Sequence, residues 1–542
     1  MIGFLTRLGK LLLKPFTEHF LFLLVFFVLA TSPCILHQFF VVKSGLNILF
    51  VAIHCFVLSY IVTLLIGLIQ FGVIRKIVQS VLIVIFAIDF GLNIYCIFNL
   101  GYLFDAEFAK IIMDTNVNEA KEFATAMLPM PIILSVLGVY LVLMCLWYLF
   151  EKYNLNLRGR LAKMALFLTC LCIFENIHVW GVWQDGPINR LMELPTYETP
   201  SNFKEYYTHP VLVFQQDSII PSNVVLILGE SFARCHSSLY GYERNTNPRL
   251  SALRDESLLY TFDSIDAPAP STAQAIKLLM STYDRQDDNT GKKWYEYTTL
   301  IEILQESGFD CYWFSNQAIG SKHNGVARAL AGLCDQRWFL QKEGSEKIDE
   351  KNQKFLDVVL VDSSYQFVNH LNPQQHNFIV FHMMGSHFHY KMRYPKEFDF
   401  FHENDYMSEP QSHREILACY DNSILYNDYI VEHIINLFRD KDALVIYFPD
   451  HGQVMYRDKR NPEYYAHGIK NDVISCAFSE EIPFVVYASP LFQKKNPRTM
   501  ARIRFRQAHT KKWNTDDLPY FIMDLIGIKE IDGENVRSKS VI

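Results

Sequence analysis

The stretch of sequence that decides the fold of the C-terminal part is Asn223-Val-Val-Leu-Ile-Leu-Gly229, a short run of apolar residues that ends in glycine. Strands that are buried on both faces have this composition, because helices cover both sides of a parallel sheet. Glu230 and Ser231 follow directly and are expected to open a helix. The stretch therefore predicts a buried parallel strand with a carboxylate at its carboxyl end.

Four later segments repeat this pattern and alternate with amphipathic stretches. These strand-like segments are Phe309–Ser315, Asn377–His382, Ala443–Phe448 and Pro483–Ala488. The stretches Leu300–Ser307 and Tyr420–Leu437 have the apolar periodicity of helices. Strands that alternate with helices indicate an α/β sandwich with a largely parallel sheet. In such sheets, binding sites form at the carboxyl ends of the strands.

Residues able to bind a metal or carry out catalysis follow these strands or lie between them. They are Glu230, Thr272, His387, Asp450, His451 and His467. Two carboxylates and an imidazole form an O/O/N donor set that Zn²⁺ accepts. A hydroxyl at the fourth position can be both ligand and nucleophile, because contact with the metal lowers its pKa. The other histidines can bind phosphoryl oxygens or protonate a leaving group. An Asp-His-Gly triplet by itself is also compatible with an ordinary turn, so the metal site depends on the whole set.

The N-terminal part of the chain contains apolar runs long enough to cross a membrane. The five expected spans are Phe16–Leu36, Ile48–Phe71, Ile77–Phe98, Leu128–Phe150 and Leu161–Val179. Basic residues precede the first run and connect the second to the third and the fourth to the fifth, whereas the loop after the third run is acidic. This charge pattern predicts a cytoplasmic N-terminus and places everything after Trp180 outside the cytoplasm.

The sequence thus predicts a transmembrane domain over 1–181, an interfacial linker over 182–222 and a catalytic domain over 223–542. The linker assignment rests on the prolines and aromatic residues of that segment. The chain of 542 residues is half hydrophobic and carries a formal net charge of −7. This composition excludes a disordered protein, and the acidic balance argues against nucleic acid as a partner.

Several motifs, in one order and spacing over roughly 223–527, resemble those of a known family. The motifs are Leu228-Gly-Glu-Ser231, Tyr240-Gly-Tyr242 with Thr246-Asn-Pro248, His382-x-x-Gly-Ser-His387, Asp450-His-Gly452 and His467-Gly468. They are similar to those of bacterial phosphoethanolamine transferases, whose catalytic domain has the fold of the alkaline phosphatase and sulfatase superfamily. That family also has a five-span N-terminal domain. The resemblance implies a multi-pass protein of the bacterial inner membrane with a periplasmic catalytic domain.

The resemblance also implies a set of site residues and a two-step reaction. Zn²⁺ would be held by Glu230, Thr272, Asp450 and His451. Thr272 would attack phosphatidylethanolamine and carry phosphoethanolamine as a covalent phosphothreonine intermediate before an acceptor takes it. His387 and His467 would be catalytic residues that contact the phosphoryl group or a second metal.

Three segments differ from the best-known lipid A-modifying members or only partly match the family. The nucleophile lies in Ala267-Pro-Ala-Pro-Ser-Thr272, so that Ser271 remains an alternative to Thr272. The Ser-Asn-Gln triplet around Asn316 is more like the members that modify lipopolysaccharide core or other periplasmic glycans, and we expect Asn316 to bind substrate. Thr115 and Glu119 resemble the donor-binding segment, although Ile111 replaces its usual asparagine. The expected acceptor is therefore lipid A, lipopolysaccharide core or another glycan.

Other functions remain compatible with the same motifs. A glycerol phosphate transferase like the lipoteichoic acid synthases, or a phosphoester hydrolase, would use the same fold. A catalytically dead receptor is a further alternative, but such a protein has no physical reason to keep two carboxylates, an imidazole and a hydroxyl. Among the cysteines outside the apolar runs, Cys311 and Cys334 form the expected disulfide, because the segment between them can close a loop.

Overall fold

The computed structural model describes residues 2–42, 45–99, 103–104, 138, 141, 152, 156–178, 203–215, 219–284, 292–318, 325–341, 356–460, 462, 464–466, 473–509 and 511–540. The chain forms two compact units, and the larger one includes Tyr197–Ile542.

The described part of the smaller unit consists of helices. They are α1 (Ile2–Thr17), α2 (Phe20–His37), α3 (Gly45–Gly67), α4 (Gly72–Asn99) and α8 (Gly159–His178), with a π-helical turn at Gln38–Val42. Helices α2, α3 and α4 pack through apolar side chains such as Phe26, which contacts Phe86 with ring centroids 4.4 Å apart. Asp89 and Asn93 are buried polar residues of α4, and the side-chain amide of Asn93 donates to the Asp89 carboxylate over 3.0 Å.

Three helices in the described part are long and apolar enough to cross a membrane, not the five that we expected. The three segments are Phe20–Phe40, Ile48–Gly67 and Gly72–Ile97. The fourth expected span, Leu128–Phe150, lies almost entirely outside the described residues. The fifth coincides with α8, which is not among the three. The expected first span also began too early, because Phe16 belongs to the separate helix α1.

A seven-stranded sheet forms the centre of the larger unit. Its strands, in spatial order, are β3 (Leu259–Phe262), β9 (Phe484–Ala488), β8 (Ala443–Pro449), β2 (Asn223–Gly229), β7 (His376–His382), β5 (Phe309–Ala318) and β6 (Gln336–Gln341). All of the neighbouring pairs are parallel except the two that involve β9. The largely parallel sheet is therefore confirmed, with the predicted strand at Pro483–Ala488 running against the others.

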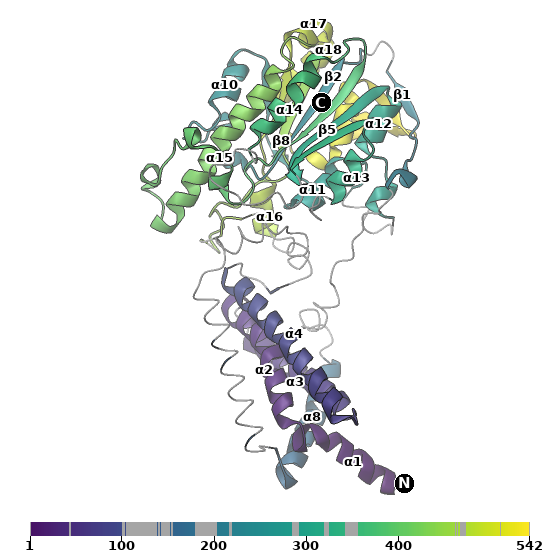
Figure 1. Ribbon diagram of the computed structural model, residues 1–542, viewed down its shortest axis with the longest axis vertical. Helices are drawn as coiled ribbons and strands as arrows, with labels where there is room; N and C mark the ends of the chain where they lie inside the picture. Colours follow the sequence, from purple (N-terminus) through teal and green to yellow (C-terminus); the bar gives the residue numbers. More distant parts are fainter. Residues whose placement is uncertain are drawn as a thin grey trace. The chain divides into compact units, whose positions relative to one another are not determined.

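Helices cover both faces of this sheet (Figure 1). The helices of this unit are α10 (Pro248–Asp255), α11 (Thr272–Leu279), α12 (Leu300–Glu306), α13 (Gly325–Ala331), α14 (Val358–Asn369), α15 (Gln411–Asn436), α16 (Val473–Glu480), α17 (Pro490–Lys495), α18 (Pro497–Ala508) and α19 (Leu518–Leu525). Helices α11, α12 and α13 contribute to one apolar core together with every second residue of β2. On the opposite face, Phe367 of α14 packs on Phe314 of β5 with ring centroids 5.5 Å apart.

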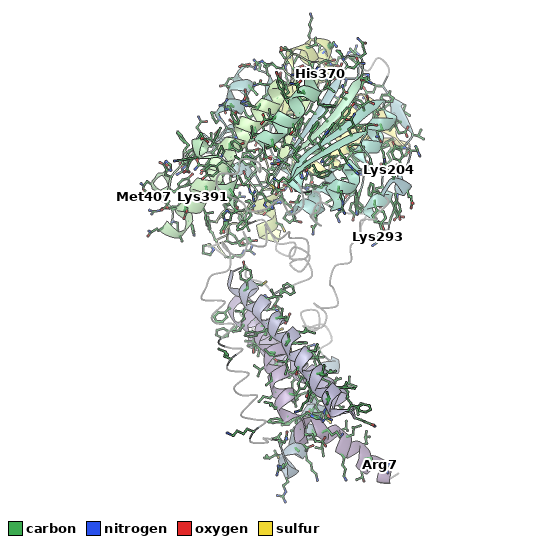
Figure 2. All side chains as sticks on the ribbon, viewed as in Figure 1. Arg7, Lys204, Lys293, His370, Lys391 and Met407 are labelled. Carbon is green, nitrogen blue, oxygen red and sulfur yellow. The ribbon has the colours of Figure 1, made fainter. Side chains whose placement is uncertain are left out.

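Smaller elements complete the unit. They are the sheet of β1 (Leu212–Phe214), β11 (Ile528–Ile531) and β12 (Glu534–Asn535), and the strand pair β4 (Ile265–Asp266) and β10 (Trp513–Asn514). Before α15, short 3₁₀ turns form a part of the surface where Lys391 and Met407 project outward (Figure 2). Cys311 and Cys334 are both buried as free thiols, so the expected disulfide is absent.

The register of the central strands decides where their ends meet. Gly229 of β2 pairs with Pro449 of β8, and Leu228 pairs with His382 of β7. The residues that follow these three strands therefore leave the sheet at the same edge. The helix expected after Glu230 is not formed, and the chain makes a 3₁₀ turn at Arg234–His236 instead.

Candidate metal centre and nucleophile

Glu230, Asp450 and His451 converge at the carboxyl ends of β2 and β8. One ligand atom from each side chain lies within 4.8 Å of those of the other two. The His451 Nε2 atom is 3.3 Å from Glu230 Oε1 and 3.6 Å from Asp450 Oδ2. Each of the three residues is only 1% exposed. Their positions follow from the strand register, which brings two carboxylates and an imidazole to one buried point.

The hydrogen bonds of the cluster leave its inner atoms available to a cation. His451 Nδ1 lies 2.8 Å from the carbonyl oxygen of Gly452, so that Nδ1–H donates to this oxygen and Nε2 is the ring nitrogen that faces the carboxylates. Asp450 Oδ1 accepts from the backbone N–H of His451 over 2.7 Å. Asp450 Oδ2 is buried and accepts no hydrogen bond within the described part of the chain. This donor set therefore fits a divalent cation such as Zn²⁺.

Without a cation, burial and the charges of the neighbouring groups shift the pKa values of all three residues. Burial raises the pKa of Asp450 to about 7, and the charge of Glu230 reinforces this. Burial lowers the pKa of His451, but the two carboxylates outweigh burial and raise it to about 9. Burial also raises the pKa of Glu230, but its hydrogen bond to His451 and the charge of that residue bring the pKa well below its usual range. A cation would compete with the proton on His451, whose pKa is raised, so binding would become stronger as the pH rises.

Thr272 lies against this cluster at the first position of α11. Its Oγ1 donates a hydrogen bond to Glu230 Oε2 over 3.1 Å and lies 3.5 Å from His451 Nε2. Ser271 is the N-cap residue in an extended conformation, and among the described contacts no hydrogen bond joins its side chain to the cluster. The prolines of Ala267-Pro-Ala-Pro270 favour an extended chain before the cap, so the helix begins at Thr272. Thr272 is half-buried, and its hydroxyl, unlike that of Ser271, contacts the cluster among the described contacts.

The backbone after Glu230 adopts an uncommon conformation. Ser231 has a φ of +57°, in the left-handed region, and its Oγ donates to Glu230 Oε1 over 2.7 Å. The Tyr420 hydroxyl donates to the Ser231 carbonyl over 2.7 Å and accepts from the N–H of Ala233 over 2.9 Å. Backbone strain of this kind persists where surrounding contacts determine the conformation. Ser231 belongs to the first of the motifs and Tyr420 begins the expected helix at Tyr420–Leu437, but no local pattern in the sequence predicts their contact.

A loop after β7 brings His387 to the same edge of the sheet. The N–H of Ser386 donates to the carbonyl of Glu230 over 3.0 Å, and the charge of His387 lowers the pKa of Glu230. The side-chain amide of Gln317 donates to the Met383 carbonyl over 3.0 Å and lies 3.5 Å from Glu230 Oε2. Gln317 is thus a further contact of the cluster that the sequence did not single out for a role.

Among the predicted site residues that the structure describes, Asn316 is not part of this cluster. Asn316 is fully buried; its amide group donates to Asp357 over 2.8 Å, and its oxygen accepts from Gln341 over 3.2 Å. His467, Thr115 and Glu119 lie outside the described residues.

The chain matches the sulfatase family model over residues 222–528. It is 24% identical over 470 residues to the phosphoethanolamine transferase EptC of Escherichia coli O18:K1:H7, a match that covers 81% of this chain and 78% of the relative. The integral membrane protein lipooligosaccharide phosphoethanolamine transferase A of Neisseria meningitidis is similar over 97% of this chain and 98% of its own, with a TM-score of 0.66 and 18% identity.

The periplasmic domain of Escherichia coli EptC in complex with Zn is similar over 61% of this chain and 89% of its own, with a TM-score of 0.53 and 24% identity. At these identities, the two structural likenesses concern the fold. The match of the family model covers more than half of the chain and includes all three residues of the metal centre as well as Thr272. The protein therefore belongs to the sulfatase family, and the resemblance to its membrane-anchored phosphoethanolamine transferases is confirmed.

Proposed function

We propose that the protein moves phosphoethanolamine from phosphatidylethanolamine to a periplasmic acceptor, either lipopolysaccharide core or lipid A. The observation that carries this proposal is the Thr272 hydroxyl, which is held against the cluster of Glu230, Asp450 and His451. The similarity to EptC along four-fifths of the chain supports the choice of the transferred group.

The proposed reaction proceeds in two steps. Thr272 Oγ1 attacks the phosphorus of the donor and forms a P–O bond, while the bond from phosphorus to the diacylglycerol oxygen breaks. Diacylglycerol leaves with a proton, and Thr272 carries phosphoethanolamine. An acceptor hydroxyl then attacks the same phosphorus, the bond to Thr272 breaks, and the threonine hydroxyl regains a proton.

Each residue of the centre has a defined task in this scheme. Glu230, Asp450, His451 and Thr272 would hold Zn²⁺, which supplies positive charge for the phosphoryl oxygens and lowers the pKa of the threonine hydroxyl. Glu230 Oε2 accepts the hydrogen bond from Thr272 and so fixes the direction of its Oγ1 lone pairs. The Zn complex of the Escherichia coli EptC domain supports this choice of metal.

The remaining contacts belong to the same proposal. His387 and His467 would bind the phosphoryl group and protonate the leaving oxygen. Thr115 and Glu119 would hold the ethanolamine end of the donor, and Asn316 remains a proposed substrate-binding residue. The charge pattern of the loops supports an inner-membrane protein with its N-terminus in the cytoplasm and residues 223–542 in the periplasm. Residues 1–181 would form the membrane domain and 182–222 the linker.

Peptide mass spectrometry after incubation with the donor lipid tests the proposal. The full chain in detergent is mixed with phosphatidylethanolamine, quenched in acid and digested. We expect a phosphoethanolamine adduct on Thr272 that is absent in Thr272→Ala and present in Ser271→Ala.

Other results would change the assignment. An adduct on Ser271 would keep the chemistry and replace the nucleophile. A glycerol phosphate adduct from phosphatidylglycerol alone would assign the protein to glycerol phosphate transfer. Release of free phosphoethanolamine without any acceptor product would indicate a hydrolase.

A further inference from the structure

Asp357 is a buried carboxylate that the proposed reaction does not use. It precedes α14, is 5% exposed and receives three hydrogen bonds of 2.8 Å. The backbone N–H of Met384 and the side-chain amide of Asn316 donate to Oδ1, and the N–H of Gly385 donates to Oδ2. Two consecutive backbone amides and one side chain therefore point at a single carboxylate.

Asp357 binds the loop that carries His387 through the backbone N–H groups of Met384 and Gly385. Ser386 follows two residues after Met384, and its backbone N–H donates to the Glu230 carbonyl over 3.0 Å. The N–H of His387 donates back to the carbonyl of Met384 over 3.2 Å. The loop is thus fixed from one side by Asp357 and from the other by the backbone of a cluster residue. A shift at Met384 and Gly385 would be transmitted to His387 within a few bonds.

Asn316 joins this arrangement through its neighbours on β5. The preceding Ser315 hydroxyl lies 3.2 Å from His382 Nδ1, and the following Gln317 amide reaches the Met383 carbonyl over 3.0 Å. Three successive residues of β5 therefore contact the end of β7, Asp357 and the beginning of the loop. Because both ends of the Asn316 amide are occupied within the protein, a substrate would have to displace Asp357 or Gln341 to reach it.

We propose that Asp357 and Asn316 are positioning residues that hold the Met384–His387 loop, and through it His387, at the candidate active site. The kinetic part of this inference rests on the proposed function, whereas the structural part does not. This role of Asn316, exerted through Asp357, is an alternative to the substrate contact proposed above, and the Asn316→Ala measurements below distinguish the two.

The hydrogen-bond chemistry requires a carboxylate at position 357. Donors approach both oxygens, so an amide in this place would turn its NH₂ group toward at least one N–H. Asp357→Asn preserves the shape of the side chain but leaves a buried donor facing another donor. The variant therefore loosens the loop without creating a cavity.

The experiment compares Asp357→Asn with Asp362→Asn in the full chain, purified in detergent with Zn²⁺. Asp362 is an exposed carboxylate of α14 and serves as the matched control. Hydrogen exchange resolved to single residues follows the amides of Met384 and Gly385, and the rate of modification by diethyl pyrocarbonate reports on His387. Turnover of phosphatidylethanolamine gives kcat and KM.

We expect the Met384 and Gly385 amides to exchange at least tenfold faster in Asp357→Asn, with an altered rate of His387 modification. The value of kcat should fall by about 10- to 100-fold, as is usual for groups that orient a functional residue, while KM changes little. Asp362→Asn should behave like the wild type in all of these measurements. Exchange rates and His387 modification equal to those of Asp362→Asn would overturn the proposal.

A second variant decides the matter if Asp357→Asn does not fold. Asn316→Ala removes one of the three donors and leaves both backbone amides on Asp357, so we expect the same effects at a smaller scale. A higher KM with unchanged kcat and unchanged exchange of Met384 and Gly385 would show that Asn316 contacts substrate instead. If the wild type fails to act on phosphatidylethanolamine but Asp357→Asn still frees the loop, the proposed function fails and the positioning role stands.

Discussion

Gly385 makes a close approach that only glycine permits, and replacing it by alanine tests how the loop supports the metal centre. Gly385 has a φ of +48°, and a Cβ atom built on it would lie 2.9 Å from both the N and the O of Glu230. Both are backbone atoms, so they cannot rotate away as the end of a flexible side chain would. Either the loop or the end of β2 has to move.

Two costs add up in Gly385→Ala. A residue with a Cβ in the left-handed region costs about 1–2 kcal/mol. Overpacking against fixed atoms costs about 1–3 kcal/mol more. We therefore expect the free energy of unfolding to fall by about 2–5 kcal/mol. The affinity for Zn²⁺ should also fall, by about tenfold for each 1.4 kcal/mol that displacement of Glu230 costs.

Gly308→Ala is the matched control for this change. Gly308 has a φ of +82°, and a Cβ atom there would meet nothing within 4 Å, so it carries the conformational cost without the contact. Urea unfolding followed by tryptophan fluorescence and a Zn²⁺ titration against a competing chelator measure both variants in detergent. The reasoning is refuted if the two variants lose the same stability and bind Zn²⁺ equally well.

Three further predictions concern the surroundings of the metal centre. Tyr420→Phe should lower the free energy of unfolding by about 2–4 kcal/mol in urea titrations, because the carbonyl of Ser231 and the N–H of Ala233 each lose a buried hydrogen-bond partner. Burial lowers the pKa of His382 from 6.5 to about 4. Between these two values the unfolded chain binds the proton more readily than the folded one, so the free energy of unfolding is highest above pH 6.5 and falls as the pH drops toward 4. This loss amounts to roughly 3 kcal/mol and should be absent in His382→Gln when urea unfolding is repeated across that pH range. Free Zn²⁺ at one hundred times its Kd should stabilise the protein by about 2.7 kcal/mol, and a chelator should reverse the effect in thermal unfolding.

Each of these predictions has an outcome that contradicts it. A stability of Tyr420→Phe equal to the wild type would mean that the Ser231 conformation does not depend on the hydroxyl. The same pH dependence in His382→Gln and in the wild type would assign acid sensitivity to other groups. If neither Zn²⁺ nor chelator changes the midpoint of thermal unfolding, the cluster does not bind the metal.

The strands and the convergence of Glu230, Asp450 and His451 could be predicted because their signals are local. The apolar run of β2 marks a buried strand by composition alone, and Asp450 and His451 directly follow another such run. Strand ends in a parallel sheet meet at one edge, so convergence followed from the pattern. The direction of β9 did not follow, because an apolar run of five residues reads the same in a parallel or an antiparallel strand.

Other features depend on partners that are distant in the sequence. The helix expected after Glu230 fails because Tyr420 holds Ser231 in the left-handed region, a contact across 189 positions. Asp357 resembles any acidic residue before a helix until the fold brings Met384 and Gly385 to it. The expected bond between Cys311 and Cys334 was inferred from their separation, which does not determine whether two thiols meet in bonding geometry.

The contrast in burial between Thr272 and the three residues behind it has a consequence for the order of events. The side chains of Glu230, Asp450 and His451 are closed off within the protein, whereas Thr272 is partly open to solvent. Donor and acceptor can therefore reach the threonine hydroxyl from its solvent-exposed side but not through the buried cluster. In the proposed transfer, donor and acceptor must use the same entrance in turn. The lipid product has to leave before the acceptor enters, and the threonine ester keeps the phosphoethanolamine in place during the exchange.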